Sequence, residues 1–119
     1  MLAGICGSVC VQAQNNPAGK TISQKKFERL SKKKNTIVLD VRTTDEYKAG
    51  HIPNATQIDV LKKEDFKAQI AGLDKNKTYL VYCRSGKRSK DAMSIMKELG
   101  FTKLYDLVCG FTNWTGVKE

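Results

Sequence analysis

The chain has 119 residues, a length that suits one domain built around one hydrophobic core. Its 21 Lys and Arg residues against 12 Asp and Glu residues give a formal net charge of +9. The lysines occur in small groups without interleaved aromatic residues, which favours a solvated surface and argues against a nucleic-acid partner.

The N-terminal stretch differs in composition from everything after it. Residues 1–14 carry no charged side chain, and Val11-Gln12-Ala13 resembles the small-residue cleavage site of a secretory signal. The basic n-region of such a signal is missing, and the stretch is too short to span a bilayer. We expect a signal-peptide remnant over residues 1–13, cleaved after Ala13, and export to the periplasm if the source is bacterial. A loose tail on a cytoplasmic protein is the alternative.

A polar linker over residues 14–20 is expected to precede one domain over residues 21–119. Short β-branched or apolar runs predict strands over 21–22, 36–41, 55–58, 79–82 and 103–108. Apolar residues at helical spacing predict helices over 24–33, 65–70 and 91–99. Short helical segments are expected after Thr43 or Thr44 and from Phe111. Ser23 is a candidate N-cap for the first helix, and Gly50 and Gly100 each mark a helix end.

Alternating strands and helices predict the α/β class. The expected architecture has three layers, with a mostly parallel sheet of about five strands flanked by helices on both faces. Sites on such sheets form in the crevice at the carboxyl ends of the strands. This rule places Asp40, Arg42, Cys83 and Cys109 along one edge of the sheet.

The stretch from Tyr79 to Ala92 carries the strongest chemical signal in the chain. Its apolar run ends at Cys83, and the following loop holds four cations and no carboxylate between Arg84 and Lys90. Gly86 gives the backbone the freedom to point successive N–H groups into one concavity. A helix N-terminus and neighbouring cations both favour the thiolate of a cysteine. The alternative is a cysteine that serves as a small buried apolar residue.

Several segments follow one another in an order shared with a known family. Leu39-Asp40-Val41-Arg42, Glu46-Tyr47 and Gly50-His51-Ile52-Pro53-Asn54-Ala55 match the motifs D-V-R, E-[YF] and G-H-I-P-x-A. Cys83-Arg84-Ser85-Gly86-Lys87-Arg88-Ser89 matches the loop C-x-x-G-x-[RK]-[ST]. Gly100-Phe101, Leu104-Tyr105 and Gly110-Phe111 to Trp114 match a closing G-F-x-x-[LV]-Y-x-L-x-G-G-[FW]-x-x-W. From about Ile22 to Trp114 the chain therefore resembles the single-domain rhodanese family, although Cys109 stands where a glycine is usual.

The resemblance implies a sulfurtransferase that needs no metal and no organic cofactor. Cys83 would take the outer sulfur of thiosulfate or of a persulfide and carry it as a persulfide to a thiophilic acceptor such as cyanide or a thiol. The loop side chains would hold the anionic leaving group, and its backbone N–H groups would receive the charged sulfur. The residues of this binding loop are Arg84, Ser85, Gly86, Lys87, Arg88 and Ser89.

Other residues are expected to have supporting roles. Asp40 and Arg42 are expected to orient the loop rather than contact the substrate. His51 is expected to stabilise its turn and not to act as a base. Ser89 is expected to cap the helix after the loop and to hydrogen-bond the sulfur. Cys109 is a candidate resolving cysteine for an oxidised or persulfidated thiol, and filling the place of a glycine is its plainer interpretation.

Two other functions stay open. A phosphatase or arsenate reductase needs an arginine six residues after its cysteine to clamp an oxyanion, and this chain has Ser89 there. A non-catalytic sulfur-carrier or redox-adaptor module is the second alternative. The expected partners are a small anionic sulfur donor and a thiol or cyanide acceptor. We expect no nucleic acid, no stable membrane insertion and a monomeric protein.

Overall fold

The computed structural model describes residues 15–16 and 18–119. The expected signal remnant over residues 1–13 and its cleavage after Ala13 lie outside the described residues and stay predictions. In the described part of the chain, none of the helices combines the length and apolar character that a membrane span requires.

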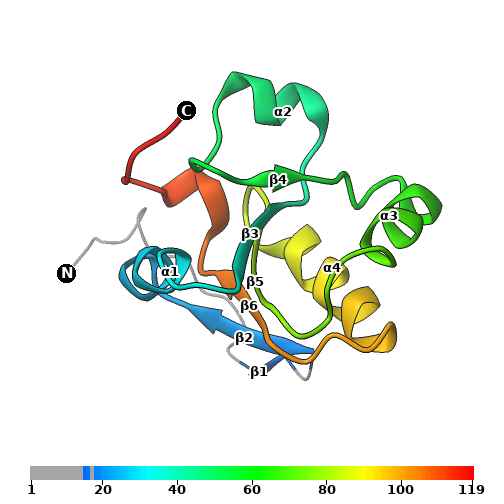
Figure 1. The fold of residues 1–119 in the computed structure, drawn as a ribbon. Helices are drawn as coiled ribbons and strands as arrows, with labels where there is room; N and C mark the ends of the chain where they lie inside the picture. The colour runs from blue at the N-terminus through cyan, green and yellow to red at the C-terminus, as the bar shows by residue number, and fades with distance from the viewer. Residues whose placement is uncertain (1–14, 17) are drawn as a thin grey trace.

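One sheet runs through the molecule, with the strand order β1-β2-β6-β5-β3-β4 (Figure 1). The strands are β1 Asn15–Asn16, β2 Gly19–Ile22, β3 Thr36–Asp40, β4 Thr56–Gln57, β5 Thr78–Tyr82 and β6 Leu104–Leu107. The pairings among β2, β6, β5, β3 and β4 are parallel, and β1 pairs with β2 antiparallel. The expected α/β class with a mostly parallel sheet of about five strands is confirmed.

Helices cover both faces of the sheet, which confirms the three-layer arrangement. They are α1 Gln24–Ser31, α2 Thr44–Ala49, α3 Lys63–Ile70 and α4 Lys87–Glu98, followed by the 3-10 turn η1 Gly110–Asn113. α1 lies on one face, and α3 and α4 lie on the other (Figure 1). Ser23 caps α1 by accepting from the Lys26 amide at 3.2 Å. Thr43 caps α2 through a reciprocal capping box with Glu46.

Alternating side chains of the central strands form a separate core on each face. Leu39 packs with Phe66 of α3 on one side, and Leu80 packs with Phe27 of α1 on the other. All four side chains are fully buried, and burying such a side chain contributes about 1.5–3 kcal/mol. Because both faces are covered, the central strands are apolar along most of their length.

Two elements differ from the expectation. The polar stretch over residues 14–20 contains β1 and the start of β2, because β2 pairs with β6 from Lys20, opposite Tyr105. α4 begins at Lys87 instead of Asp91. Gly86 has φ 104° and turns the chain straight from the loop into the helix, in a left-handed conformation that glycine adopts without strain. The loop is therefore short, and its last cations belong to the first turn of α4.

Candidate active site

Cys83 is the first residue after β5, at the carboxyl end of the strand. β5 lies between β6 and β3, where the strand order reverses, and open α/β sheets bind ligands at such a point. The side chain is 1% exposed and is a free thiol. The Gly86 amide donates to its Sγ atom at 3.0 Å. The sulfur therefore rests at the base of the loop with a backbone N–H directed at it.

The cations of the loop differ in their surroundings. Arg84 and Lys87 are exposed. Arg88 is half-buried, and its guanidinium donates to Glu46 of α2 at 2.8 Å (Oε1) and 3.0 Å (Oε2). This hydrogen bond is the main cause that lowers the pKa of Glu46 from 4.5 to about 2, and it raises the pKa of Arg88. Arg88 thus pairs with Glu46 of α2 and also interacts electrostatically with Cys83.

Ser89 contacts the sulfur as expected but does not cap the helix. It is buried in the first turn of α4, and Gly86 holds the N-cap position without a side-chain cap. Its Oγ atom lies 3.7 Å from the Sγ of Cys83 and 3.1 Å from the Gly86 carbonyl oxygen. The side chain therefore packs beneath the loop, beside the thiol.

Asp106 of β6 is a buried acid below the loop that the sequence analysis did not single out. Its carboxylate is fully buried and accepts from Ser89 Oγ at 2.8 Å, Lys90 Nζ at 3.1 Å and Thr21 Oγ1 at 2.7 Å. The signal for it was strand alternation, which puts Asp106 on the same buried face as Leu104. A buried carboxylate needs hydrogen-bonding or charged partners, and α4 and β2 supply those of Asp106.

Asp40 and Arg42 form a buried ion pair where β3 ends. Arg42 Nη2 lies 2.7 Å from Asp40 Oδ2 and also donates to the Gly50 carbonyl oxygen at 2.8 Å. The guanidinium lies 4.5 Å from the ring centre of Phe111. The Tyr82 hydroxyl donates to Asp40 Oδ2 at 2.6 Å, and burial together with the Asp40 charge raises the pKa of Tyr82. These contacts join the pair to the turn at residue 50 and to η1, and its expected role in orienting the loop after Cys83 stays a prediction.

His51 is held in its turn by contacts of its own. Its Nδ1 atom lies 2.9 Å from the Tyr47 carbonyl oxygen, and its ring stacks on Tyr47 with centroids 3.7 Å apart. Its backbone exchanges two hydrogen bonds with Glu119. These contacts match the expected turn-stabilising role.

η1 closes the loop from the other side. The Phe111 amide donates to the Cys83 carbonyl oxygen at 2.9 Å, and the Thr112 amide donates to the Arg84 carbonyl oxygen at 3.0 Å. Gly110 has φ +61°, and a Cβ atom there would lie 2.5 Å from the Arg84 carbonyl oxygen. Only glycine fits this contact, so the backbone of η1 sets the position of the loop after Cys83.

Cys109 stands just before η1 and is buried. Its φ of 62° is left-handed, which costs a non-glycine residue about 1–2 kcal/mol and explains why glycine is usual at this position. Cys83 is a free thiol, so it forms no disulfide with Cys109. A role of Cys109 in resolving an oxidised Cys83 stays a prediction.

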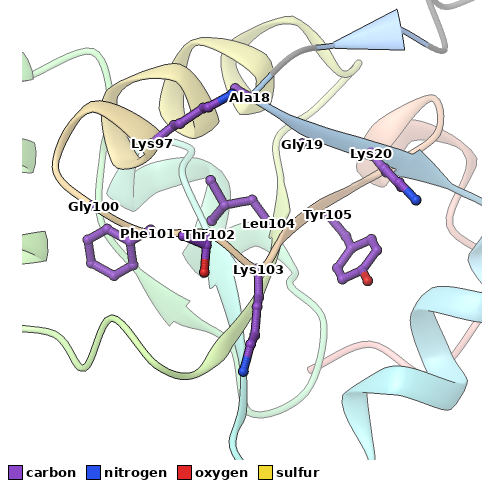
Figure 2. Close-up of a pocket in the computed structure, with 10 residues that line it drawn as sticks. All are labelled: Ala18, Gly19, Lys20, Lys97, Gly100, Phe101, Thr102, Lys103, Leu104 and Tyr105. Atoms are coloured by element: carbon purple, nitrogen blue, oxygen red, sulfur yellow. The ribbon is translucent and has the colours of Figure 1, made fainter.

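A pocket of about 480 Å³ lies at the opposite end of the sheet (Figure 2). Phe101, Lys103 and Leu104 line it where the chain enters β6, and Lys20 lines it from β2. Because β5 and β6 are parallel, this pocket is at the amino end of the strands and Cys83 is at the carboxyl end. It does not belong to the candidate active site.

Known proteins resemble this chain over most of its length. The family model described as the rhodanese-like domain matches residues 23–116. Thiosulfate sulfurtransferase GlpE of Coxiella burnetii is 35% identical over 95 residues, which cover 80% of this chain and 86% of the relative. The putative sulfur carrier protein YrkF of Bacillus subtilis is 37% identical over 82 residues, which cover 69% of this chain and 43% of the relative. The crystal structure of a rhodanese-related protein from Thermoplasma volcanium superposes with a TM-score of 0.67 at 30% identity, covering 79% of this chain and 88% of that one. The chain belongs to the rhodanese-like domain family.

Proposed function

We propose that this protein is a sulfurtransferase that carries a sulfane sulfur as a persulfide on Cys83. The contact between the Gly86 amide and Sγ is the observation that carries the proposal. Gly86 is the N-cap residue of α4, and no side chain caps this helix. The N-terminus of α4 therefore faces the sulfur. The uncapped N–H groups and the positive end of the helix stabilise negative charge there, as both a thiolate and a persulfide require.

In the first half-reaction, the Cys83 thiolate attacks the outer sulfur of thiosulfate. A new S–S bond forms to Sγ, the S–S bond of the donor breaks, and its electron pair leaves with sulfite. The enzyme then carries a persulfide anion, so charge is conserved. Arg84 and Lys87 are exposed beside the thiol, and they attract the donor and its anionic leaving group.

In the second half-reaction, a nucleophile removes the outer sulfur. Cyanide yields thiocyanate, and a thiolate yields a new persulfide; in both cases the S–S bond to Sγ breaks and its electron pair returns to the Cys83 thiolate. The chain itself forms and breaks only sulfur–sulfur bonds, and the proposed mechanism uses no metal or organic cofactor. The proposed partners are thus two small molecules, and the proposed acting form is a monomer.

Mass spectrometry of the full chain after treatment with thiosulfate tests the proposal. We expect the peptide that contains Cys83 to gain one sulfur atom and to lose it when cyanide is added, with thiocyanate released. Cys83→Ser, the matched control, should gain none. If Cys83 stays unmodified with both thiosulfate and a thiol persulfide, the sulfurtransferase proposal is wrong.

A sulfur-carrier module is the second candidate, because a relative at 37% identity is named as a putative sulfur carrier protein. A carrier would accept sulfur on Cys83 but turn over slowly with free small-molecule acceptors. Steady-state rates with thiosulfate and with a thiol persulfide, each with cyanide as the acceptor, separate the two. We expect multiple turnovers with at least one donor and none in Cys83→Ala.

We also propose export of the protein after cleavage behind Ala13. The uncharged, apolar composition of residues 1–13 supports this proposal. N-terminal sequencing of the protein isolated from its natural source tests it. A first residue at Gln14 is expected, and an intact Met1 on the whole cellular pool would contradict it.

A further inference from the structure

The Ser89 hydroxyl has one proton and lies between three acceptors. Its Oγ atom is 2.8 Å from Asp106 Oδ2, 3.1 Å from the Gly86 carbonyl oxygen and 3.7 Å from Cys83 Sγ. The carboxylate oxygen is the nearest of the three and is charged, and hydrogen bonds to charged acceptors are about twice as strong as neutral ones. The proton therefore points at Asp106, and a lone pair of Oγ faces the sulfur.

This orientation has a consequence for Cys83. While the Ser89 hydroxyl donates its hydrogen bond to Asp106, its Oγ atom accepts a hydrogen bond from the S–H group of Cys83, as the Sγ-to-Oγ contact indicates. This bond stabilises the protonated thiol. The Gly86 amide has the opposite effect, because it donates to Sγ and stabilises the thiolate. When the sulfur becomes a thiolate or a persulfide, it needs the Ser89 proton for itself.

Asp106 keeps two partners when Ser89 turns away. Lys90 Nζ lies 3.1 Å from the same Oδ2 atom, and Thr21 Oγ1 lies 2.7 Å from Oδ1. A fully buried carboxylate without such partners would be strongly destabilising. Rotation of one O–H bond is therefore enough to move the hydrogen bond from the carboxylate to the sulfur, with no change in the fold.

We propose that Asp106 is a positioning residue that sets the direction of the Ser89 proton and thereby the fraction of Cys83 present as thiolate. It acts through Ser89 and contacts neither donor nor acceptor. The inference rests on the proposed sulfur-transfer function, because that reaction uses the Cys83 thiolate. Its test, however, reads alkylation of the thiol, a reaction that needs no sulfur donor.

Other charges near the thiol must be separated from this effect. Cations lie in the loop and on α4, and carboxylates lie on the neighbouring elements. They are Arg84, Lys87, Arg88 and Lys90, then Glu46 of α2, Asp59 after β4, Asp106 of β6 and Asp40, which is paired with Arg42 at the end of β3. Asp106 is the carboxylate that hydrogen-bonds Ser89, so its effect must depend on that hydroxyl.

The rate of Cys83 alkylation by iodoacetamide as a function of pH, read on the Cys83 peptide by mass spectrometry, tests the proposal. Asp106→Asn should move the midpoint about one pH unit lower, because a neutral amide oxygen competes less for the Ser89 proton. In that background, Ser89→Ala should move the midpoint back up, since Ser89 then donates to the thiolate. In the otherwise unchanged chain, Ser89→Ala should leave the midpoint in place or lower it. If it instead raises the midpoint by about a unit, Ser89 already donates to the sulfur and the proposal is overturned.

Two further variants control for charge and folding. Asp91→Asn removes an exposed carboxylate from the same helix and should leave the midpoint unchanged. Lys90→Met removes both a cation and a partner of Asp106, and it should raise the midpoint more in the otherwise unchanged chain than in Ser89→Ala, where only the loss of the cation acts. This comparison gives an answer even if Asp106→Asn fails to fold. If the alkylation midpoint is unchanged in both Asp106→Asn and Lys90→Met, the inference is overturned. Absent sulfur transfer combined with these shifts contradicts the proposed function alone.

Discussion

A single contact decides the role of Arg88. Its position in the loop places it beside the thiol, but its guanidinium forms two hydrogen bonds with the Glu46 carboxylate. Paired bonds of this kind match the planar fork of arginine. Arg88 therefore joins α4 to α2 behind the loop. The charge of Arg88 also interacts with Cys83, and Arg84 and Lys87 are exposed.

The Glu46 and Arg88 pair predicts a pH-dependent loss of stability in Glu46→Gln. The folded state lowers the pKa of Glu46 from 4.5 to about 2, so the pair stabilises the folded protein fully above about pH 4.5 and progressively less as the pH falls towards 2. We expect Glu46→Gln to lower the free energy of unfolding by about 1 kcal/mol at pH 7. The difference from the unmodified chain should shrink between pH 4.5 and 2. Urea unfolding at a series of pH values measures it.

Glu64→Gln is the matched control for this experiment. Glu64 is 91% exposed and pairs with Lys67 at 3.8 Å within α3, so its removal should change stability by less than about 0.5 kcal/mol at any pH. A difference for Glu46→Gln that is absent at pH 7, or that persists unchanged at pH 2, would contradict the assignment of the pair.

Among the secondary-structure elements, η1 determines where the loop after Cys83 lies. Gly110→Ala would place a Cβ atom 2.5 Å from the Arg84 carbonyl oxygen, at φ +61°. Backbone cannot yield as a flexible side chain does, so η1 must move and lose its bonds to Cys83 and Arg84. We expect the free energy of unfolding to fall by about 2–3 kcal/mol and sulfur transfer to fall with it. Chemical unfolding and thiocyanate release measure the two effects.

Gly72→Ala controls for the loss of a glycine. Its Cβ atom would meet the Gln69 carbonyl oxygen at 3.7 Å, an ordinary contact, so stability should stay within about 1 kcal/mol and activity should be unchanged. If Gly110→Ala behaves like Gly72→Ala, η1 does not determine the position of the loop.

Local patterns predicted most of these elements, and contacts between distant segments account for the rest. The strands at β3 and β5, the caps at Ser23 and Thr43 and the position of Cys83 follow from neighbouring residues. The early start of α4 depends on the backbone of Gly86, and β2 is extended by its pairing with β6.

Contacts between remote segments also complete the site. Arg88 reaches a carboxylate 42 residues away, and Asp106 is held by Ser89 and Thr21, which are 17 and 85 residues away. Spacing along the chain does not reveal such partners. Alternation along β6 puts Asp106 on a buried face, and a buried charge needs partners. The sequence could therefore indicate that Asp106 has partners, but not which residues they are.

For the whole molecule, the question is whether the net charge of +9 or the local cations attract an anionic donor to Cys83. Screening separates the two, since the Debye length is about 30 Å at 0.01 M salt and about 8 Å at 0.15 M. Lys33 and Lys34 are exposed before the amino end of β3, and five strand residues span about 16 Å. Lys33 and Lys34 should therefore attract anions to Cys83 only at low salt.

The ratio of Cys83 alkylation rates by anionic iodoacetate and neutral iodoacetamide measures this attraction, because the thiolate fraction cancels. We expect the double variant Arg84→Gln and Lys87→Gln to lower the ratio several-fold at both about 0.01 M and about 0.15 M salt. The matched double variant Lys33→Gln and Lys34→Gln removes the same charge and should lower the ratio only at the lower salt concentration. Equal effects of the two variants at about 0.15 M would mean that the molecule's overall field, and not the loop, draws anions to the thiol.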